Sequence, residues 1–280
     1  MQPKAFFSLR SERDLVEEGD SYWGRGLSFA FPVAYLWIGA ALSIATAGLL
    51  AYVGLLTAKR PAGHESQLAL RMFALWWFSA GVVLLLSGMP SILGAFGIFD
   101  AGLALATTYI LSVPLASALC GLVSYLVFVY TGSRTALRWI VAGYALFFLF
   151  ELYYFGSFGP RELVATEWSV RAVAQTRPAV WLSAAFGIAV AVPVLACAVS
   201  YGALYFRVTQ RDQRFRVALV SSAFLLWFGP LLFGFIVGWD RADWFPLVYE
   251  GPGVVASAMI LLANHPPRRV RQWLTTDSGA

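Results

Sequence analysis

Two glutamates, Glu151 and Glu250, lie well inside long apolar stretches of the sequence. An ionisable side chain at the centre of a membrane helix costs about 2.5–3.5 kcal/mol on insertion scales, so each marks a candidate functional site. At a rise of about 1.5 Å per residue, both carboxyls are expected about 9–10 Å from the outer ends of their helices. Their similar depth predicts a polar pocket that opens to the outside and holds a cation, a proton or a polar ligand head.

Hydroxyl side chains are expected at the same depth as the two carboxyls. Tyr109 and Thr108 lie in one apolar stretch, and Tyr249 precedes Glu250 in another. Together with Glu250 and Glu151 they form the predicted ligand or proton site. The alternative interpretation is structural, with each glutamate bonded to a neighbouring helix or reaching the membrane interface beside an arginine.

Seven apolar stretches are long enough to cross a membrane as helices. Of the 280 residues, 59% are hydrophobic and 12% are charged, a composition that excludes a soluble globular domain. About 20 apolar residues span a bilayer, and continuous rather than alternating apolar runs favour helices over barrel strands. We therefore predict an all-α membrane protein with a seven-helix transmembrane bundle over 29–265, an extracytoplasmic tail at 1–28 and a basic cytoplasmic tail at 266–280. The predicted spans are 31–58, 72–97, 103–131, 135–157, 179–206, 216–238 and 243–264.

Lysine and arginine are unequally distributed between the two sides of the predicted bundle. The side that holds the C terminus carries more of the 20 Lys and Arg residues than the side that holds the N terminus. The positive-inside rule then predicts the N terminus outside and the C terminus inside, in a prokaryotic cell membrane. Anionic lipid headgroups at the inner face are the expected partner of this charge. A nucleic-acid partner is not expected, because no basic face with interleaved aromatic residues is present.

Two segments outside the spans have patterns of their own. Residues 160–175 begin with Pro160, which suits a first helical turn. An apolar stripe follows at Leu163, Val164, Trp168 and Val170. The pattern predicts a short helix on the outer interface, with a structured loop as the alternative. The basic run PPRRVRQW near the C terminus predicts an anchor to lipid headgroups.

The two halves of the sequence carry similar residues at a nearly constant offset of about 140 residues. The offset predicts a three-helix unit, a linker helix and a second three-helix unit in the same orientation, as in transporters with parallel repeats. Chance alignment is the alternative. The matching pairs are Pro90 and Pro230, Gly94 and Gly234, Asp100 and Asp240, and Pro114 and Pro252.

Catalytic and metal-binding patterns are not apparent. Cys120 and Cys197 both lie in apolar stretches and are interpreted as core residues. His64 is expected in the loop after the first span and His265 at the inner end of the last, and two histidines are too few for a metal centre. No hydrolase triad or phosphate-binding loop is present, so an enzyme, a metal site and a haem are not expected.

The third and seventh stretches resemble helices of microbial rhodopsins. TTYILSVPLASAL (107–119) is similar to the opsin third helix, and YEGPGVVASAMILL (249–262) is similar to the seventh. In this resemblance Glu250 takes the place of the opsin acid, and Val254 takes the place of the lysine that binds retinal. Thr108 takes the place of the counterion carboxylate of a pump. The resemblance implies an opsin-like scaffold without covalent retinal.

Three functions remain open at this point. The first is an opsin-like protein that binds a small ligand non-covalently in the bundle, as a sensor or carrier. The second is a transporter that couples a small solute to a proton at Glu250. The third is a structural subunit of a homo- or hetero-oligomeric membrane complex without a site of its own.

Overall fold

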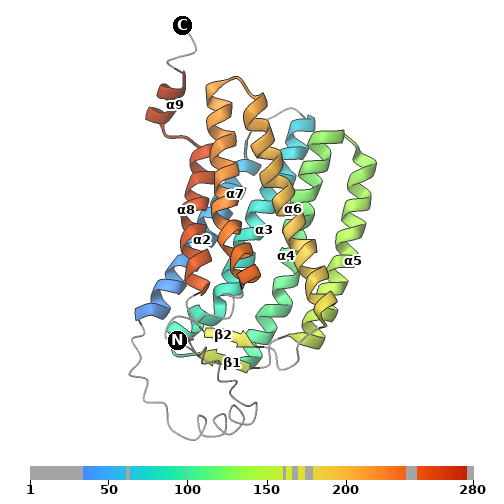
Figure 1. Cartoon of the computed structure of the whole chain (residues 1–280), viewed down its shortest axis with the longest axis vertical. Coiled ribbons are helices and arrows are strands. Elements are labelled where there is room, and N and C mark those ends of the chain that lie inside the picture. Colours follow the sequence, from blue (N-terminus) through green and yellow to red (C-terminus); the bar gives the residue numbers. More distant parts are fainter. Residues whose placement is uncertain are drawn as a thin grey trace, which may run out of the picture. The chain divides into compact units, whose positions relative to one another are not determined.

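Seven helices of 20 residues or more make up most of the described part of the chain (Figure 1). The computed structural model describes residues 34–60, 64–98, 100–159, 162–165, 170–173, 179–237 and 245–275. Helical structure follows from the apolar sequence, because a backbone in lipid must satisfy its hydrogen bonds within its own segment. The helices are α2 (Ala34–Ala58), α3 (His64–Ala95), α4 (Ala101–Thr131), α5 (Arg134–Phe158), α6 (Val180–Arg207), α7 (Arg211–Val237), α8 (Phe245–Asn264) and the short α9 (Arg268–Thr275).

The helix boundaries agree with the predicted spans to within three residues, except where polar turns extend a helix. α3 begins at His64 instead of 72 and α7 begins at Arg211 instead of 216. His64 is therefore the first residue of a helix and not part of a loop. Glutamate, glutamine and arginine are good helix formers, so a helix continues beyond its apolar stretch. The predicted tail at 1–28 lies outside the described residues.

Six of the helices form a closed ring, and α5 lies outside it. α2 packs against both α3 and α8, α3 against α4, α4 against α6, α6 against α7, and α7 against α8. α5 packs against α4 and meets α6 through stacked rings, with Tyr154 and Phe186 centred 5.1 Å apart. The fourth long helix is thus peripheral, as a linker between two three-helix units would be. The proposed sequence repeat itself stays a prediction.

The centre of the ring is filled by large aromatic side chains. Trp77 on α3 is fully buried, and its ring centre lies 5.6 Å from that of Phe224 on α7. Phe73 stacks on Tyr125 of α4 at 4.5 Å. Burial of such rings supplies dispersion contacts that a lipid environment does not replace at equal density. The core is therefore formed mainly between α3, α4 and α7.

Glycines allow α2 and α3 to pack backbone against backbone. A Cβ placed on Gly81 of α3 would lie 2.8 Å from the carbonyl oxygen of Ala47 on α2. A Cβ on Gly54 of α2 would lie 2.8 Å from the backbone nitrogen of Phe78 on α3. Small residues at helix interfaces permit this close approach in membrane proteins.

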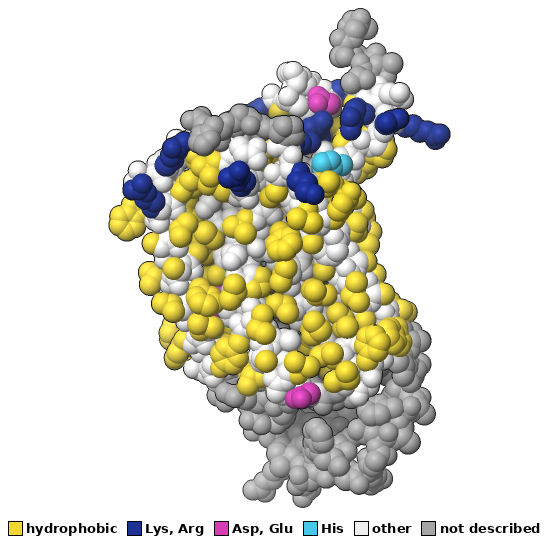
Figure 2. All heavy atoms as spheres, turned by 180° about the vertical axis from the view of Figure 1, so that it is seen from behind, with side chains coloured by type: hydrophobic (Ala, Val, Ile, Leu, Met, Phe, Trp, Pro, Cys, Tyr) yellow, Lys and Arg dark blue, Asp and Glu magenta, His cyan; other side chains and the backbone are white. Residues whose placement is uncertain are grey.

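Five of the described helices are long and apolar enough to cross a membrane, as judged by length and composition. Their outward surfaces are apolar: Leu146 on α5 is 68% exposed and Val199 on α6 is 70% exposed. Figure 2 shows apolar side chains covering the middle of one face and Lys and Arg gathered at the end nearest α9, here called the basic end. These features are those of a multi-pass membrane protein. The five segments are Leu36–Ala58, Gln67–Ala95, Leu105–Thr131, Arg134–Phe158 and Trp181–Arg207.

The described residues between α5 and α6 form two short paired strands, here called the hairpin, so the predicted interfacial helix is wrong for them. β1 (Glu162–Ala165) and β2 (Val170–Val173) pair antiparallel, with Ala165 opposite Val170. The backbone N–H and C=O of Val170 are both hydrogen-bonded to the Ser91 hydroxyl of α3, at 3.3 and 3.4 Å. This tertiary contact, together with β-branched valines, favours strands over the helix that the apolar stripe suggested. Pro160 and Trp168 lie outside the described residues.

Candidate functional site

Glu250 lies near the start of α8 and is hydrogen-bonded to α2. The Ser43 hydroxyl donates to its Oε1 at 2.8 Å, across a separation of 207 residues in the sequence. Ser43 is 3% exposed and Glu250 is 9% exposed, so the contact lies inside the bundle. The second carboxyl oxygen, Oε2, is buried and has no hydrogen-bond partner among the described residues. A buried acceptor without a donor costs free energy, so this oxygen would gain from a hydrogen-bond donor.

Small and polar residues surround this contact. A Cβ on Gly88 of α3 would lie 2.5 Å from the Ser43 hydroxyl, so the backbone of α3 covers the serine. One turn along α8 from Glu250, Gly253 lies beside the Trp227 indole nitrogen and Thr46. Thr46 donates to a carbonyl of its own helix, that of Leu42, at 2.9 Å. The site therefore combines one carboxyl group with closely packed small and polar residues.

Glu151 lies in a different part of the protein, so the predicted pocket shared by two carboxyls is not formed. Glu151 belongs to α5, outside the ring, whereas Glu250 belongs to α8, which packs against α2 and α7 (Figure 1). Glu151 is fully buried, and neither of its carboxyl oxygens has a partner among the described residues. It shares a helix face with Phe147 and Tyr154, whose rings stack on Phe186 of α6.

The hydroxyl residues predicted to line the Glu250 site are not shown to gather around it. Tyr109 of α4 points toward α5, where its hydroxyl would lie 3.1 Å from a Cβ on Gly156. It therefore belongs to the α4–α5 contact and not to the Glu250 site. Thr108 is its neighbour on α4, half-buried. The side chain of Tyr249 lies outside the described residues, and Val254 lies one turn after Glu250 on α8.

Two polar contacts were missed in the sequence because they involve residues without charge. Ser43 is the partner of Glu250, and only its position in an apolar stretch distinguishes it from a surface serine. Tyr125 of α4 and Tyr201 of α6 join their hydroxyls at 3.0 Å. A search limited to ionisable groups passes over both. A buried hydroxyl in an apolar helix is itself a signal, because it needs a partner there.

Metal-binding groups are sparse in the described part of the chain. No group of three or more His, Cys, Asp or Glu residues is placed there to hold a metal ion. Cys120 and Cys197 are free thiols. The chemistry available at the candidate site is therefore that of a carboxyl group: accepting hydrogen bonds, pairing with a cation or carrying a proton.

His265 directly follows α8 at the basic end and is surrounded by arginines. Partial burial lowers its pKa below the ordinary 6.5, and the charges of Arg60, Arg271 and Arg216 lower it further. Arg60 extends from the end of α2 and donates to the carbonyl oxygen of Asn264 at 2.8 Å. Protonated His265 would add a fourth positive charge to this group.

We expect acidification to destabilise the fold through His265. In the unfolded chain the imidazole binds a proton near its ordinary pKa of 6.5, whereas the folded state binds it only at lower pH. The unfolded state then carries more protons, so the free energy of unfolding decreases as the pH falls below 6.5. Thermal melts of detergent-solubilised protein between about pH 7.5 and 5.5 should show this slope, and His265→Gln should flatten it. Equal slopes in the two proteins would contradict the assignment.

The polar features described above are the contact of Glu250 with Ser43 and the arginines of the basic end. No family model matches the chain, and no curated protein matches its sequence significantly.

Proposed function

We propose that the chain is a cell-membrane protein with seven spanning helices that binds a small ligand in its bundle through Glu250, as a sensor or carrier. The observation that carries the proposal is the buried Oε2 of Glu250, which lacks a donor among the described residues. Its other oxygen is held by Ser43, so the carboxyl is fixed in place before a ligand arrives. Fixed polar groups in a largely apolar surrounding are typical of small-molecule sites.

The proposal includes α7 and α8 among the spanning helices. α7 contains no charged residue from 217 to 237, and α8 has 20 residues, or about 30 Å of helix. Both close the ring between α6 and α2, which supports a common orientation in the bilayer. The gathering of Lys and Arg at the basic end supports placing that end and the C terminus inside, and the N terminus outside (Figure 2).

The ligand that suits Glu250 carries a cation or a hydrogen-bond donor. Within the described residues no Lys, Arg or His forms an ion pair with this carboxyl. A carboxylate buried in an apolar region is stabilised most by a positive charge or by N–H and O–H donors. An ammonium, amidine or hydroxyl group at the end of a small molecule meets that need.

An opsin-like arrangement without covalent retinal is part of this proposal. Val254 follows Glu250 by four residues, so the two share one face of α8. A valine has no amine, and the only lysines of the sequence are Lys4 and Lys59. Binding through Glu250 is therefore non-covalent.

The proposal is tested by identifying what the purified protein holds. We expect extraction and mass spectrometry, with an absorption spectrum, to find a small molecule bearing such a donor. Glu250→Gln should weaken binding roughly 10- to 150-fold, because one hydrogen bond to a charged group contributes about 1.5–3 kcal/mol. The glutamine carbonyl still accepts from Ser43, so the fold is preserved.

Glu151→Gln is the matched control, since it removes a second buried carboxyl from a separate part of the protein. Occupancy should be unchanged in this variant. Equal loss in both variants, or no bound molecule in the unchanged protein, would refute Glu250 as a ligand site. Retained structure in each variant is checked by its circular dichroism and melting temperature.

A further inference from the structure

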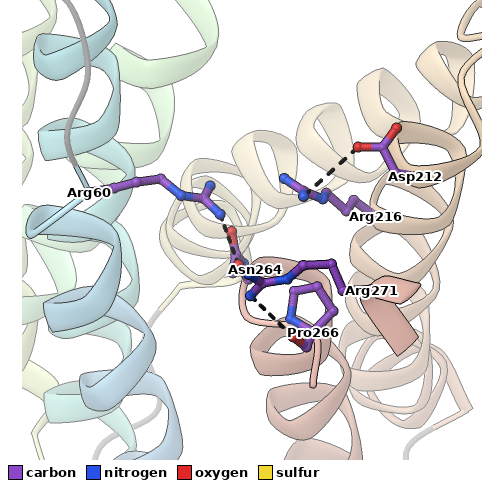
Figure 3. Close-up of polar contacts among 6 residues, drawn as sticks. All are labelled: Arg60, Asp212, Arg216, Asn264, Pro266 and Arg271. Atoms are coloured by element: carbon purple, nitrogen blue, oxygen red, sulfur yellow. Dashed lines mark hydrogen bonds and ion pairs between the residues drawn. The ribbon is translucent and has the colours of Figure 1, made fainter. Parts of the chain in front are cut away.

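Three arginines from separate elements converge at the basic end of the bundle. Figure 3 shows the side chains of Arg60, Arg216 and Arg271 pointing toward the same region, from the end of α2, from α7 and from α9. We call these three residues the arginine cluster. The chain segment around Asn264 and Pro266, where α8 ends, lies between them.

Two members of the cluster are held by backbone carbonyl groups. Arg60 donates through Nη2 to Asn264 O at 2.8 Å, and Arg271 donates through Nη2 to Pro266 O at 3.5 Å. The carboxyl end of a helix carries partial negative charge, which attracts such cations. The end of α8 thus fixes the positions of two guanidinium groups.

The third member, Arg216, has a guanidinium group whose hydrogen-bond donors are only partly paired. Arg216 pairs with Asp212 one turn earlier at 3.9 Å, and both side chains are about two-fifths exposed, so the pair contributes little. Its Nε is buried and has no hydrogen-bond partner among the described residues. The Nε–H of Arg216 is therefore a buried hydrogen-bond donor that could be satisfied by an additional acceptor.

Among the described side chains of this region, positive charge exceeds negative charge. Burial lowers the pKa of Arg60, and the charge of Arg216 lowers it further, which shows that the two guanidinium groups repel each other. Arg60, Arg216 and Arg271 also oppose protonation of His265. Against them, Asp212 is the one acid in an ion pair with the cluster among the described residues. An anion between the arginines would remove this repulsion.

The cluster lies where a lipid headgroup would be expected. α9 carries Trp273, which is 54% exposed and meets Arg211 of α7 in a cation–π contact at 4.0 Å. The adjacent Leu274 is buried. A short helix with one buried apolar side and several arginines is typical of segments that lie at the membrane interface.

We propose that the arginine cluster binds a phosphate group, supplied by an anionic phospholipid headgroup or by free phosphate. Guanidinium groups match phosphate oxygens in pairs of hydrogen bonds, and an anion between the three would compete only with the weak, partly exposed contact to Asp212 among the described residues. The anion links residues of α7 and α9 with the chain segments at the ends of α2 and α8. It therefore stabilises the end of the ring at which α2 packs against α8. This site is separate from Glu250, which lies near the opposite end of α8.

The test compares Arg216→Gln with Arg138→Gln in the full chain. Arg138 on α5 lies at the same end, is exposed and is outside the cluster, so its substitution removes equal charge. Each protein is placed in nanodiscs of phosphatidylcholine, with or without phosphatidylglycerol, and separately in phosphatidylcholine with inorganic phosphate. Retained phospholipid is counted by native mass spectrometry, and the melting temperature is recorded.

We expect phosphatidylglycerol to raise the melting temperature of the unchanged protein and of Arg138→Gln. Arg216→Gln should bind about tenfold less, the equivalent of one lost charged hydrogen bond. A rise with inorganic phosphate alone would assign the site to free phosphate, and a rise only with phosphatidylglycerol would assign it to lipid. Equal loss in both variants, or no response to either phosphate source, would overturn the proposal.

Discussion

Leucine in place of Gly81 should destabilise the protein by about 3 kcal/mol, because the α2–α3 contact has no room for a side chain. A Cβ at this position would lie 2.8 Å from Ala47 O and 3.1 Å from Ala51 N, both backbone atoms that no rotamer change can move. The helices must therefore separate, which weakens the packing along their whole contact. The loss is measured as a lower free energy of unfolding in a dodecyl sulfate titration of mixed micelles.

Gly48→Leu is the control for this substitution. Gly48 lies on α2, is exposed, and a Cβ there meets nothing within 4 Å. The same leucine should then change the free energy of unfolding by about 0.5 kcal/mol or less. If both leucines cost the same, the effect would come from the residue type and the close packing of α2 on α3 would be disproved.

Removing the Ser43 hydroxyl should cost about 1–3 kcal/mol of stability, the second large effect that we expect. Ser43→Ala leaves both oxygens of Glu250 without a donor in a buried place. Adding Glu250→Leu should restore stability close to that of the unchanged protein, since replacing both partners removes the unsatisfied group. Unfolding titrations of the two single variants and the double variant give the coupling energy directly.

Ser257→Ala serves as the matched serine control. Ser257 lies on α8, and its hydroxyl is buried like that of Ser43. It donates, however, to the carbonyl oxygen of Gly253 in its own helix, at 2.7 Å. Loss of such a local bond should change the stability by about 0.5 kcal/mol or less. A double variant no more stable than Ser43→Ala alone would show that the hydroxyl does not act through Glu250.

The helices could be predicted from the sequence because each is set by local composition. A run such as 103–131 is mostly apolar and has no charged residue, and its end at Gly132 follows from a residue that adopts φ of +62°. The hairpin could not be predicted in the same way. Its strands depend on Ser91 of α3, which is far away in the sequence, and no local pattern reveals that contact.

The position of Glu250 in a spanning segment can be predicted from the sequence, because its charge stands out in an apolar stretch without knowledge of neighbours. Whether it binds a ligand stays a prediction. Its depth resembles that of Glu151, but depth gives position along the membrane normal and not position around the ring. α5 lies outside the ring and does not pack against α8, so Glu151 is separated from Glu250, and Tyr109 of α4 faces Gly156 of α5.

The closure of the ring by α2 and α8 fixes when the site can exist during biosynthesis. Ser43 leaves the ribosome 207 residues before Glu250, a delay of roughly 10–40 s at ordinary rates of synthesis. During that interval α2 is inserted while its polar partner has not been made. The hydrogen bond between Ser43 and Glu250 is therefore among the last to form, and a chain that stops before α8 lacks the site completely.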